Sequence, residues 1–335
     1  MKSLRQVKSL FACGAVLVGM AGATASAAEL KLAHFMPPKH PMDRGVMTPL
    51  TEEIKAATDG ELTIRIYPAG ELGKGPVQQY KRVVTGVADI AFGIPAYTPT
   101  QFPKTTLVHM PGLFSDGTAA TNALWDNLPS IEDEYGQVKL LGLWANNPAV
   151  FISREKPVRN LADLQGMKVR TPNPIMAKVV EAWGAIPVSM PITETYNAMN
   201  TGVIDAVIMG PSGIRSYKMN EVAKFITTNL PTAVDSFYIL MNKTSWDALS
   251  DEQKAELEKV TGREMSLRGA DAFYNAGQAG LKIAEDANVE MLEASDADVA
   301  AMREAMAEAV NAYVAQVSKD ANADGAAIVA GFAGK

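Results

Sequence analysis

The chain has 335 residues, of which 47% are hydrophobic, and its formal net charge is −6. This length and composition are sufficient for more than one hydrophobic core, so we expect about two domains. Such an acidic chain lacks the electrostatic footprint of a nucleic-acid-binding protein and that of a polybasic membrane surface.

The first 27 residues have the pattern of a secretory signal peptide: a basic start, a short apolar run over residues 10–20, and Ala-Ser-Ala ending at Ala27. The apolar run is too short to span a bilayer, which disfavours a membrane anchor. We predict cleavage near Ala27 and a periplasmic location. Removing the three basic residues changes the net charge from −6 to −9, and those residues are Lys2, Arg5 and Lys8.

Cysteine and histidine usage excludes several kinds of chemistry. The only cysteine, Cys13, lies within the leader, and most of the apolar run follows it, whereas a lipoprotein signal needs that run before it. A mature chain without cysteine has no disulfide, thiolate metal site or cysteine nucleophile. The histidines His34, His40 and His109 lack metal-ligand spacing, and a solvated or core role is expected for them. We therefore expect no metal site and no cofactor.

The first half of the mature chain alternates strands and helices. Residues 30–35, 62–67 and 87–92 have the apolar patterns of strands, and helices are predicted over residues 43–57 and 77–85. Alternation of this kind predicts a mostly parallel sheet.

The second half repeats this order. Its predicted elements are a strand over 139–144, a strand ending at Arg170, helices over 175–183 and 194–200, and strands near Val188 and over 203–209. Gly86 to Asp89 and Gly202 to Asp205 occupy equivalent places in the two halves, where glycine suits a helix end and aspartate can bond backbone at a strand start. Asp205 is accordingly expected to brace structure rather than to touch solute.

The remainder is predicted to be helical. Ser250 and Gln253 form a capping box that opens a long helical region towards Glu285. A final helix carries one apolar stripe, for which docking onto a lobe is favoured over a partner surface. The stripe consists of Val299, Met302, Met306, Val310, Tyr313 and Val317.

Arg170 is the leading candidate for a binding residue. It sits at the carboxyl end of a predicted strand, just before Pro172, and that end of a strand opens onto the ligand crevice of an α/β sheet. The guanidinium can bind a carboxylate with two parallel hydrogen bonds. A receptor for an organic anion is therefore indicated, with a structural ion pair within one lobe as the alternative.

Four matches carry a family likeness: Tyr67 to Gly73; Gly86 to Asp89; Asp163 to Pro172; and Gly184 to Pro187 followed by Glu194 to Tyr196 and Gly202 to Asp205. In this order and spacing, the chain resembles the solute-binding subunits of tripartite ATP-independent periplasmic (TRAP) transporters, of the dicarboxylate-binding (DctP) type. The likeness covers nearly the whole mature chain.

The resemblance implies an α/β fold of the two-lobe periplasmic binding protein type (type II-like), with hinge strands and a long helix that spans both lobes. The expected boundaries are 28–146 plus about 235–275 for lobe I and 147–234 plus about 276–335 for lobe II. The resemblance also implies a small organic-acid ligand, an arginine–carboxylate contact at Arg170, and the small and large TRAP membrane subunits as partners. A monomer is expected.

Departures from the family pattern narrow the expected ligand. An amide of the family is replaced near Met209 and Gly210, and the region of Asn146 and Asn147 carries no cation. Positions that match pocket-lining residues are apolar, and these are Phe35, Ile94 and Ile192. A dicarboxylate or sugar acid would leave polar groups unpaired there, so a monocarboxylate with an apolar or aromatic body is favoured, with 2-oxo and 2-hydroxy acids both open.

Further pocket candidates each have a structural alternative. Trp144, Phe35, Tyr97 and Phe237 could line the pocket or fill the core, and the asparagines at 146 and 147 could contact ligand or simply form a turn before a proline.

Two other functions compete with transport. A binding protein that feeds a sensor system would look the same in sequence. An exported hydrolase is disfavoured because the Gly-x-Ser-x-Gly elbow is absent, and the run from Gly210 to Gly213 has the wrong spacing for it. We therefore expect no catalytic residue and no enzymatic activity.

Overall fold

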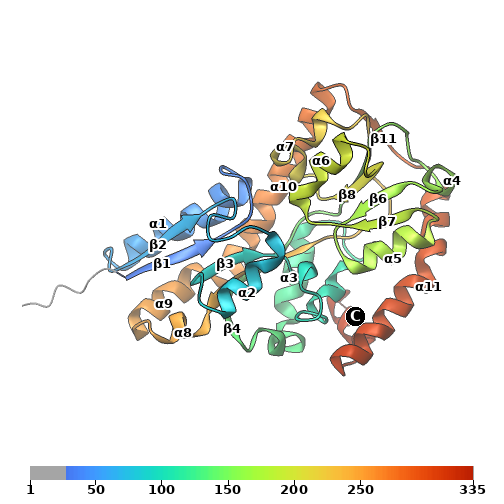
Figure 1. Cartoon of the computed structure of the whole chain (residues 1–335). Helices are drawn as coiled ribbons and strands as arrows, with labels where there is room; N and C mark the ends of the chain where they lie inside the picture. Colours follow the sequence, from blue (N-terminus) through green and yellow to red (C-terminus); the bar gives the residue numbers. More distant parts are fainter. Residues whose placement is uncertain (1–27, 335) are drawn as a thin grey trace, which may run out of the picture.

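The structure is a computed structural model that describes residues 28–334. The predicted signal peptide, residues 1–27, and with it Cys13, lie outside the described residues. Residues 28–334 form two β-sheets with helices packed around them, which makes the chain an α/β protein of two lobes (Figure 1). Within this range, no helix combines the length and the apolar character that crossing a membrane requires.

The first lobe is built on a five-stranded sheet with the order β2-β1-β3-β10-β4. β1 pairs in parallel with β2 and β3, whereas β10 runs antiparallel between β3 and β4. Every residue of β3 and β10 is buried, as expected for central strands with both faces covered. The elements are β1 (Ala28–Ala33), η1 (Asp43–Met47), α1 (Thr48–Ala57), β2 (Leu62–Tyr67), η2 (Pro76–Gln78), α2 (Gln79–Val84), β3 (Ile90–Gly93), η3 (Pro95–Tyr97), η4 (Thr105–His109), α3 (Gly117–Asp126), η5 (Leu128–Ser130), η6 (Glu132–Tyr135), β4 (Val138–Ala145), β10 (Ser236–Asn242), α8 (Lys243–Asp247) and α9 (Asp251–Val260).

The second lobe is built on a six-stranded sheet with the order β11-β9-β5-β8-β6-β7. β6 pairs in parallel with β7 and β8, and β5 runs antiparallel between β8 and β9. The elements are β5 (Val150–Ser153), α4 (Leu161–Leu164), β6 (Lys168–Thr171), α5 (Pro174–Ala182), β7 (Ile186–Ser189), η7 (Ile192–Glu194), α6 (Thr195–Asn200), β8 (Ala206–Met209), α7 (Gly213–Ser216), η8 (Met219–Glu221), β9 (Phe225–Thr227) and β11 (Glu290–Leu292).

Both sheets are mixed, so the expectation of mostly parallel sheets is wrong for the strands next to the crossings between lobes. The chain passes from β4 to β5 and returns from β9 to β10, and each crossing delivers a strand that runs against its neighbours. The two crossing segments lie side by side: Asn146 donates its N–H to the carbonyl of Asp235 at 3.0 Å, and Ala149 donates to Ala233 at 2.9 Å. These paired segments are the hinge between the lobes.

The equivalent aspartates of the two halves, Asp89 and Asp205, form equivalent hydrogen bonds. Oδ2 of Asp89 accepts the N–H of Lys31 in β1, and Oδ2 of Asp205 accepts the N–H of Lys168 in β6, both at 2.8 Å. The preceding glycines at 86 and 202 adopt φ of 71° and 74°, which suits a helix end. Each aspartate therefore ties a strand start to its parallel neighbour, and the expected bracing role of Asp205 is confirmed.

Helix α10 (Gly262–Asp286) contacts both lobes and runs between them (Figure 1). The capping box predicted at Ser250 is present. The Ser250 N–H donates to Oε1 of Gln253, and the Gln253 N–H donates to Oγ of Ser250, both at 3.1 Å. That box opens only α9, however. The helical region breaks at Gly262, whose φ of 75° an α-helix cannot continue through, and α10 begins there.

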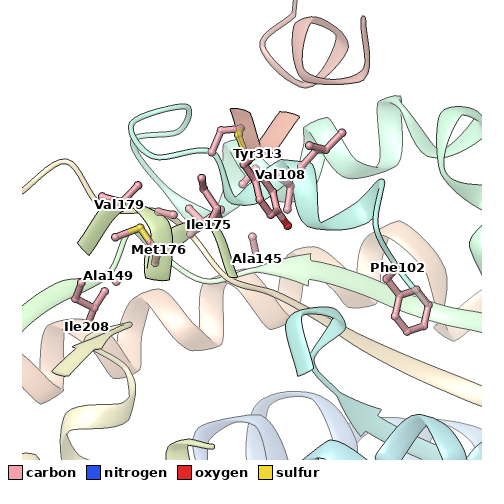
Figure 2. Packing of buried hydrophobic residues seen from close by; sticks show 14 of the residues in the cluster. Phe102, Val108, Ala145, Ala149, Ile175, Met176, Val179, Ile208 and Tyr313 are labelled. Atoms are coloured by element: carbon pink, nitrogen blue, oxygen red, sulfur yellow. The ribbon is translucent and has the colours of Figure 1, made fainter. Parts of the chain in front are cut away.

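The last two helices, α11 (Asp296–Ala321) and α12 (Gly325–Phe332), close the core. The predicted stripe of α11 docks on the protein, with Met302 and Tyr313 buried and the Met302 carbonyl accepting Nε1–H of Trp183 at 3.0 Å. Figure 2 shows Tyr313 in one cluster with Val108 of the first lobe and Ile175 of the second. The core is thus continuous across the hinge.

Candidate functional site

A cavity lies where the two sheets meet the hinge. It encloses about 530 Å³ of empty space, a value that includes the part open to solvent. Nine of the residues singled out from the sequence line it: Phe35, Ile94, Tyr97, Asn146, Arg170, Ile192, Met209, Gly210 and Phe237. The cavity therefore gathers side chains from both lobes and from the hinge.

Arg170 is held in place by the protein backbone. Its Nε donates to the carbonyl of Met190 at 3.0 Å and Nη1 donates to that of Ile208 at 3.1 Å, while Nη2 lies 3.5 Å from Oη of Tyr97. These contacts use three of the five N–H groups of a guanidinium. The side chain is fixed, and it keeps N–H groups available for a ligand.

Arg170 forms no ion pair with the described residues 28–334. The residue is only 2% exposed, and no carboxylate of residues 28–334 approaches it within the 4.0 Å of an ion pair. A buried charge without a partner is costly. An anionic ligand would remove this cost, because its carboxylate could take the free N–H groups in pairs.

Aromatic rings form one wall of the cavity. Phe92 stacks on Phe237 with centroids 5.7 Å apart and an interplanar angle of 13°, and Phe273 packs 4.6 Å from Phe237. Phe35 extends the wall, 5.6 Å from Phe92 and 6.3 Å from Tyr97. Rings in this arrangement offer a flat apolar surface to a ligand of similar character.

Two of the sequence candidates lie outside the cavity lining. Trp144 is completely buried behind the wall, 5.8 Å from Phe92 and against Gly269 of α10, where the missing side chain leaves room for the indole. Asn147 faces the start of α3, where its Oδ1 accepts the N–H of Gly117 at 3.0 Å. Packing explains the first residue and helix-start bonding explains the second.

Several lining residues were not among the sequence candidates. Phe92 lies in a strand predicted from its apolar pattern, and Phe273 lies in a helical region predicted from a capping box. Neither signal reveals which apolar residues face a cavity. His40 also lines it, but burial lowers its pKa to about 3 and its Nδ1 accepts the N–H of Met42 at 3.2 Å, so it is neutral. The others are Met36, Pro172, Ser212, Gly213, Tyr217 and Asp235.

Asp235 is the one acid in the cavity lining of residues 28–334. Its Oδ1 accepts Nδ2–H of Asn173 at 2.8 Å, and its N–H donates to Oδ1 of Asn146 at 2.8 Å. Burial raises the pKa of the Asp235 carboxyl, and the hydrogen bond from Asn173 and the charge of Arg170 partly offset that rise. The only sequence signal was an acid directly before an apolar strand.

Two α/β lobes around a cavity, with a buried arginine that forms no ion pair within residues 28–334, are the arrangement expected of a solute-binding protein. Residues 32–316 match the family model of bacterial extracellular solute-binding protein family 7, DctP, and the chain belongs to this family. It is a solute-binding subunit of the TRAP type and not an enzyme.

Solved structures of similar proteins support the same class. A marine metagenome TRAP solute-binding protein from an unidentified microbe, specific for aromatic acid ligands and bound to metahydroxyphenylacetate, is 28% identical with a TM-score of 0.87, covering 91% of this chain and 97% of that one. A TRAP periplasmic solute-binding protein from Bordetella bronchiseptica with bound (R)- and (S)-mandelate is 29% identical with a TM-score of 0.83, covering 92% and 98%.

A curated relative has a different ligand. The C4-dicarboxylate-binding periplasmic protein DctP of Rhodobacter capsulatus is 25% identical over 254 residues, which is 74% of this chain and 75% of the relative.

Proposed function

We propose that this chain is a periplasmic receptor for a monocarboxylic acid with an apolar, preferably aromatic, body, which it delivers to TRAP membrane subunits. The observation that carries the proposal is the buried charge of Arg170, which forms no ion pair within residues 28–334, beside a wall of phenylalanine rings. Arg170 would bind the carboxylate, and the wall would bind the body of the ligand. The lobes would close around it, with the ligand favouring the closed state.

The comparisons support an aromatic monoacid more than a dicarboxylate. The two solved structures described above contain metahydroxyphenylacetate and mandelate, which are aromatic monocarboxylates. Among the lining residues within 28–334, Arg170 alone carries a permanent positive charge. A second ligand carboxylate would be desolvated without a cationic partner, which costs more than the roughly 1–3 kcal/mol of an unpaired neutral group.

The periplasmic location and the transporter partners follow from the family and from the predicted leader. The Rhodobacter capsulatus relative is itself a periplasmic protein. A chain without cysteine after Ala27 fits an oxidising compartment.

A ligand screen tests this function. The purified chain from residue 28 onwards would be melted with benzoate, phenylacetate, mandelate, branched aliphatic acids and succinate, each beside its neutral amide. At one hundred times the dissociation constant, a ligand should add roughly 2.7 kcal/mol of stability. We expect shifts with aromatic monoacids and none with their amides, confirmed by titration calorimetry. Shifts only with succinate, or equal shifts with acids and amides, would contradict the proposal.

A further inference from the structure

Besides Arg170, the cavity has a second polar part, which lies at the hinge and contrasts with the apolar aromatic wall. It consists of Asp235 and Asn146, whose side chains are 7% and 4% exposed, and both line the cavity. The sequence pattern made Asn146 a candidate for ligand contact and gave Asp235 no role. Bulk water cannot solvate these two buried residues freely, so their unused hydrogen-bonding groups need partners within the cavity.

The orientation of the Asn146 amide is fixed. Its Oδ1 accepts the N–H of Asp235, and Nδ2 therefore points the other way, towards Gly210. A Cβ on Gly210 would stand 2.3 Å from this nitrogen, so glycine is what allows the approach. Within residues 28–334, no hydrogen bond from Asn146 Nδ2 is made. The amide thus offers a donor at the cavity wall.

The Asp235 carboxyl is fixed in the same way. Its Oδ1 is occupied by Asn173, which also caps the start of α5 through the N–H of Met176 at 2.9 Å. Oδ2 makes no hydrogen bond with the described residues 28–334. A carboxyl oxygen and an amide N–H, each with free hydrogen-bonding capacity, therefore belong to two hydrogen-bonded residues of the cavity lining.

This pair lies close to Arg170. Asn173, which holds Asp235, follows Arg170 by three residues at the end of β6, and the charge of Arg170 acts on the Asp235 carboxyl. The two charged groups nevertheless stay beyond the 4.0 Å of an ion pair. Arg170 and Asp235 line the same cavity, so one bound ligand can contact both.

We propose that Asp235 and Asn146 bind a hydroxyl group on the carbon next to the ligand carboxylate, so that the site takes a 2-hydroxy monocarboxylic acid. This rests on the proposed function, in which Arg170 holds the carboxylate. The hydroxyl donates to Oδ2 of Asp235 and accepts from Nδ2 of Asn146. Both hydrogen-bonding capacities of the hydroxyl are then used.

A hydroxyl suits Asp235 in either protonation state. An ionised carboxyl accepts the ligand O–H, and a protonated one donates to the ligand oxygen. The groups that share the cavity with it are Arg170, which favours the ionised form, and Tyr97, Tyr217 and His40, which are neutral. A 2-oxo group only accepts, so Asn146 can donate to it but Asp235 can match it only in the protonated form. A second carboxylate would face repulsion from the ionised form.

Three ligands with the same carbon skeleton test the inference: mandelate, its deoxy analogue phenylacetate, and its 2-oxo analogue phenylglyoxylate. Titration calorimetry on the wild type should show mandelate binding roughly 10- to 100-fold tighter than phenylacetate, the worth of a hydrogen bond to a charged group. In Asp235→Ala this ratio should fall below about 3, while the affinity for phenylacetate stays within about 3-fold. The surface variant Asp247→Ala should keep the wild-type ratio.

A second variant covers the possibility that Asp235→Ala fails to fold. Asp235→Asn keeps the shape and adds an N–H donor, so phenylglyoxylate should gain affinity relative to mandelate. A wild-type ratio near 1, or a ratio that Asp235→Ala leaves unchanged, would overturn the inference, as would an Asp235→Asn variant with the wild-type order. Failure of the proposed function is distinguishable, because then no aromatic acid would bind more tightly than its amide.

Discussion

The hydroxyl of Tyr97 in the first lobe accepts the backbone N–H of Ile192 in the second, with 3.0 Å between Oη and N. The same hydroxyl lies 3.5 Å from Nη2 of Arg170. One side chain therefore links the loop after β3 to the loop after β7 and to the buried guanidinium. The same oxygen therefore bridges the two lobes and contacts the arginine.

Tyr97→Phe should shift the protein towards an open form. The closed state would leave the Ile192 N–H without its acceptor, at about 1–3 kcal/mol, whereas water can bond that N–H when the lobes part. We expect affinity for the best acid of the screen to fall roughly 5- to 100-fold, and small-angle scattering to show a larger radius of gyration without ligand. Tyr196→Phe, which removes a surface contact to Glu221, is the control. Equal affinity and equal size in both variants would rule out the link.

Arg170→Lys should abolish most binding although the charge is kept. An ammonium cannot reach the carbonyls of Met190 and Ile208 and also offer two parallel hydrogen bonds to a carboxylate. The expected loss is about 2–5 kcal/mol in titration calorimetry. Arg263→Lys, at an exposed pair with Asp126, should bind normally. Wild-type affinity in the Arg170→Lys variant would show that the carboxylate binds elsewhere.

Much of each lobe could be predicted from local patterns, and so could Arg170. The short sequence around Pro172 predicts a strand that ends just before this proline. The carboxyl end of such a strand faces the ligand crevice of an α/β sheet. The sequence does not show on which face of the sheet Trp144 lies. The last five residues of β4 are all buried, so no alternation of polar and apolar residues distinguishes the two faces. Whether the nine residues at the cavity bind ligand remains a prediction.

Asp235 shows why the rest of the site could not be predicted. Its partners Asn146 and Asn173 are 89 and 62 positions away in the chain. Asn146 meets Asp235 because the two segments that cross between the lobes lie side by side, and Asn173 reaches it from the loop between β6 and α5. Both contacts depend on the complete topology rather than on any local pattern. Before the fold is known, an acid ahead of a buried strand looks like an ordinary loop residue.

The buried histidines should make stability depend on pH. Burial lowers the pKa of His34 to about 4 and that of His109 to about 3, from 6.5. The unfolded chain therefore binds protons that the folded chain refuses, and the free energy of unfolding falls as pH drops from about 6.5 towards 4, by up to about 1.4 kcal/mol per pH unit for each histidine. Burial raises the pKa of Glu134 and Asp235, and these carboxyls act in the opposite direction.

A variant separates the histidine contribution from that of the carboxyls. Urea unfolding of the wild type and of His34→Gln, measured at pH 7.5, 6.5, 5.5 and 4.5, gives a difference in which the carboxyl contributions cancel. As pH falls, the wild type should lose up to about 1.4 kcal/mol per unit more than the variant below pH 6.5. A difference that stays constant from pH 7.5 to 4.5 would mean that the folded protein protonates His34 readily.

Gly269→Ala should displace Trp144, which packs behind the aromatic wall of the cavity. A Cβ at this position would stand 2.7 Å from Cε2 of Trp144, a ring with no exposed surface that cannot swing away and that lies 6.5 Å from Phe237. Alanine is the better helix former by about 1 kcal/mol, but overpacking against a rigid ring typically costs about 1–3 kcal/mol. We expect net destabilisation in urea unfolding and weaker binding of aromatic acids, because the displaced indole pushes the wall into the cavity. Gln278→Ala, on the exposed face of the same helix, should change stability by less than about 0.5 kcal/mol. A Gly269→Ala protein that is more stable than the wild type and binds normally would show that Trp144 has room to move and does not set the shape of the wall.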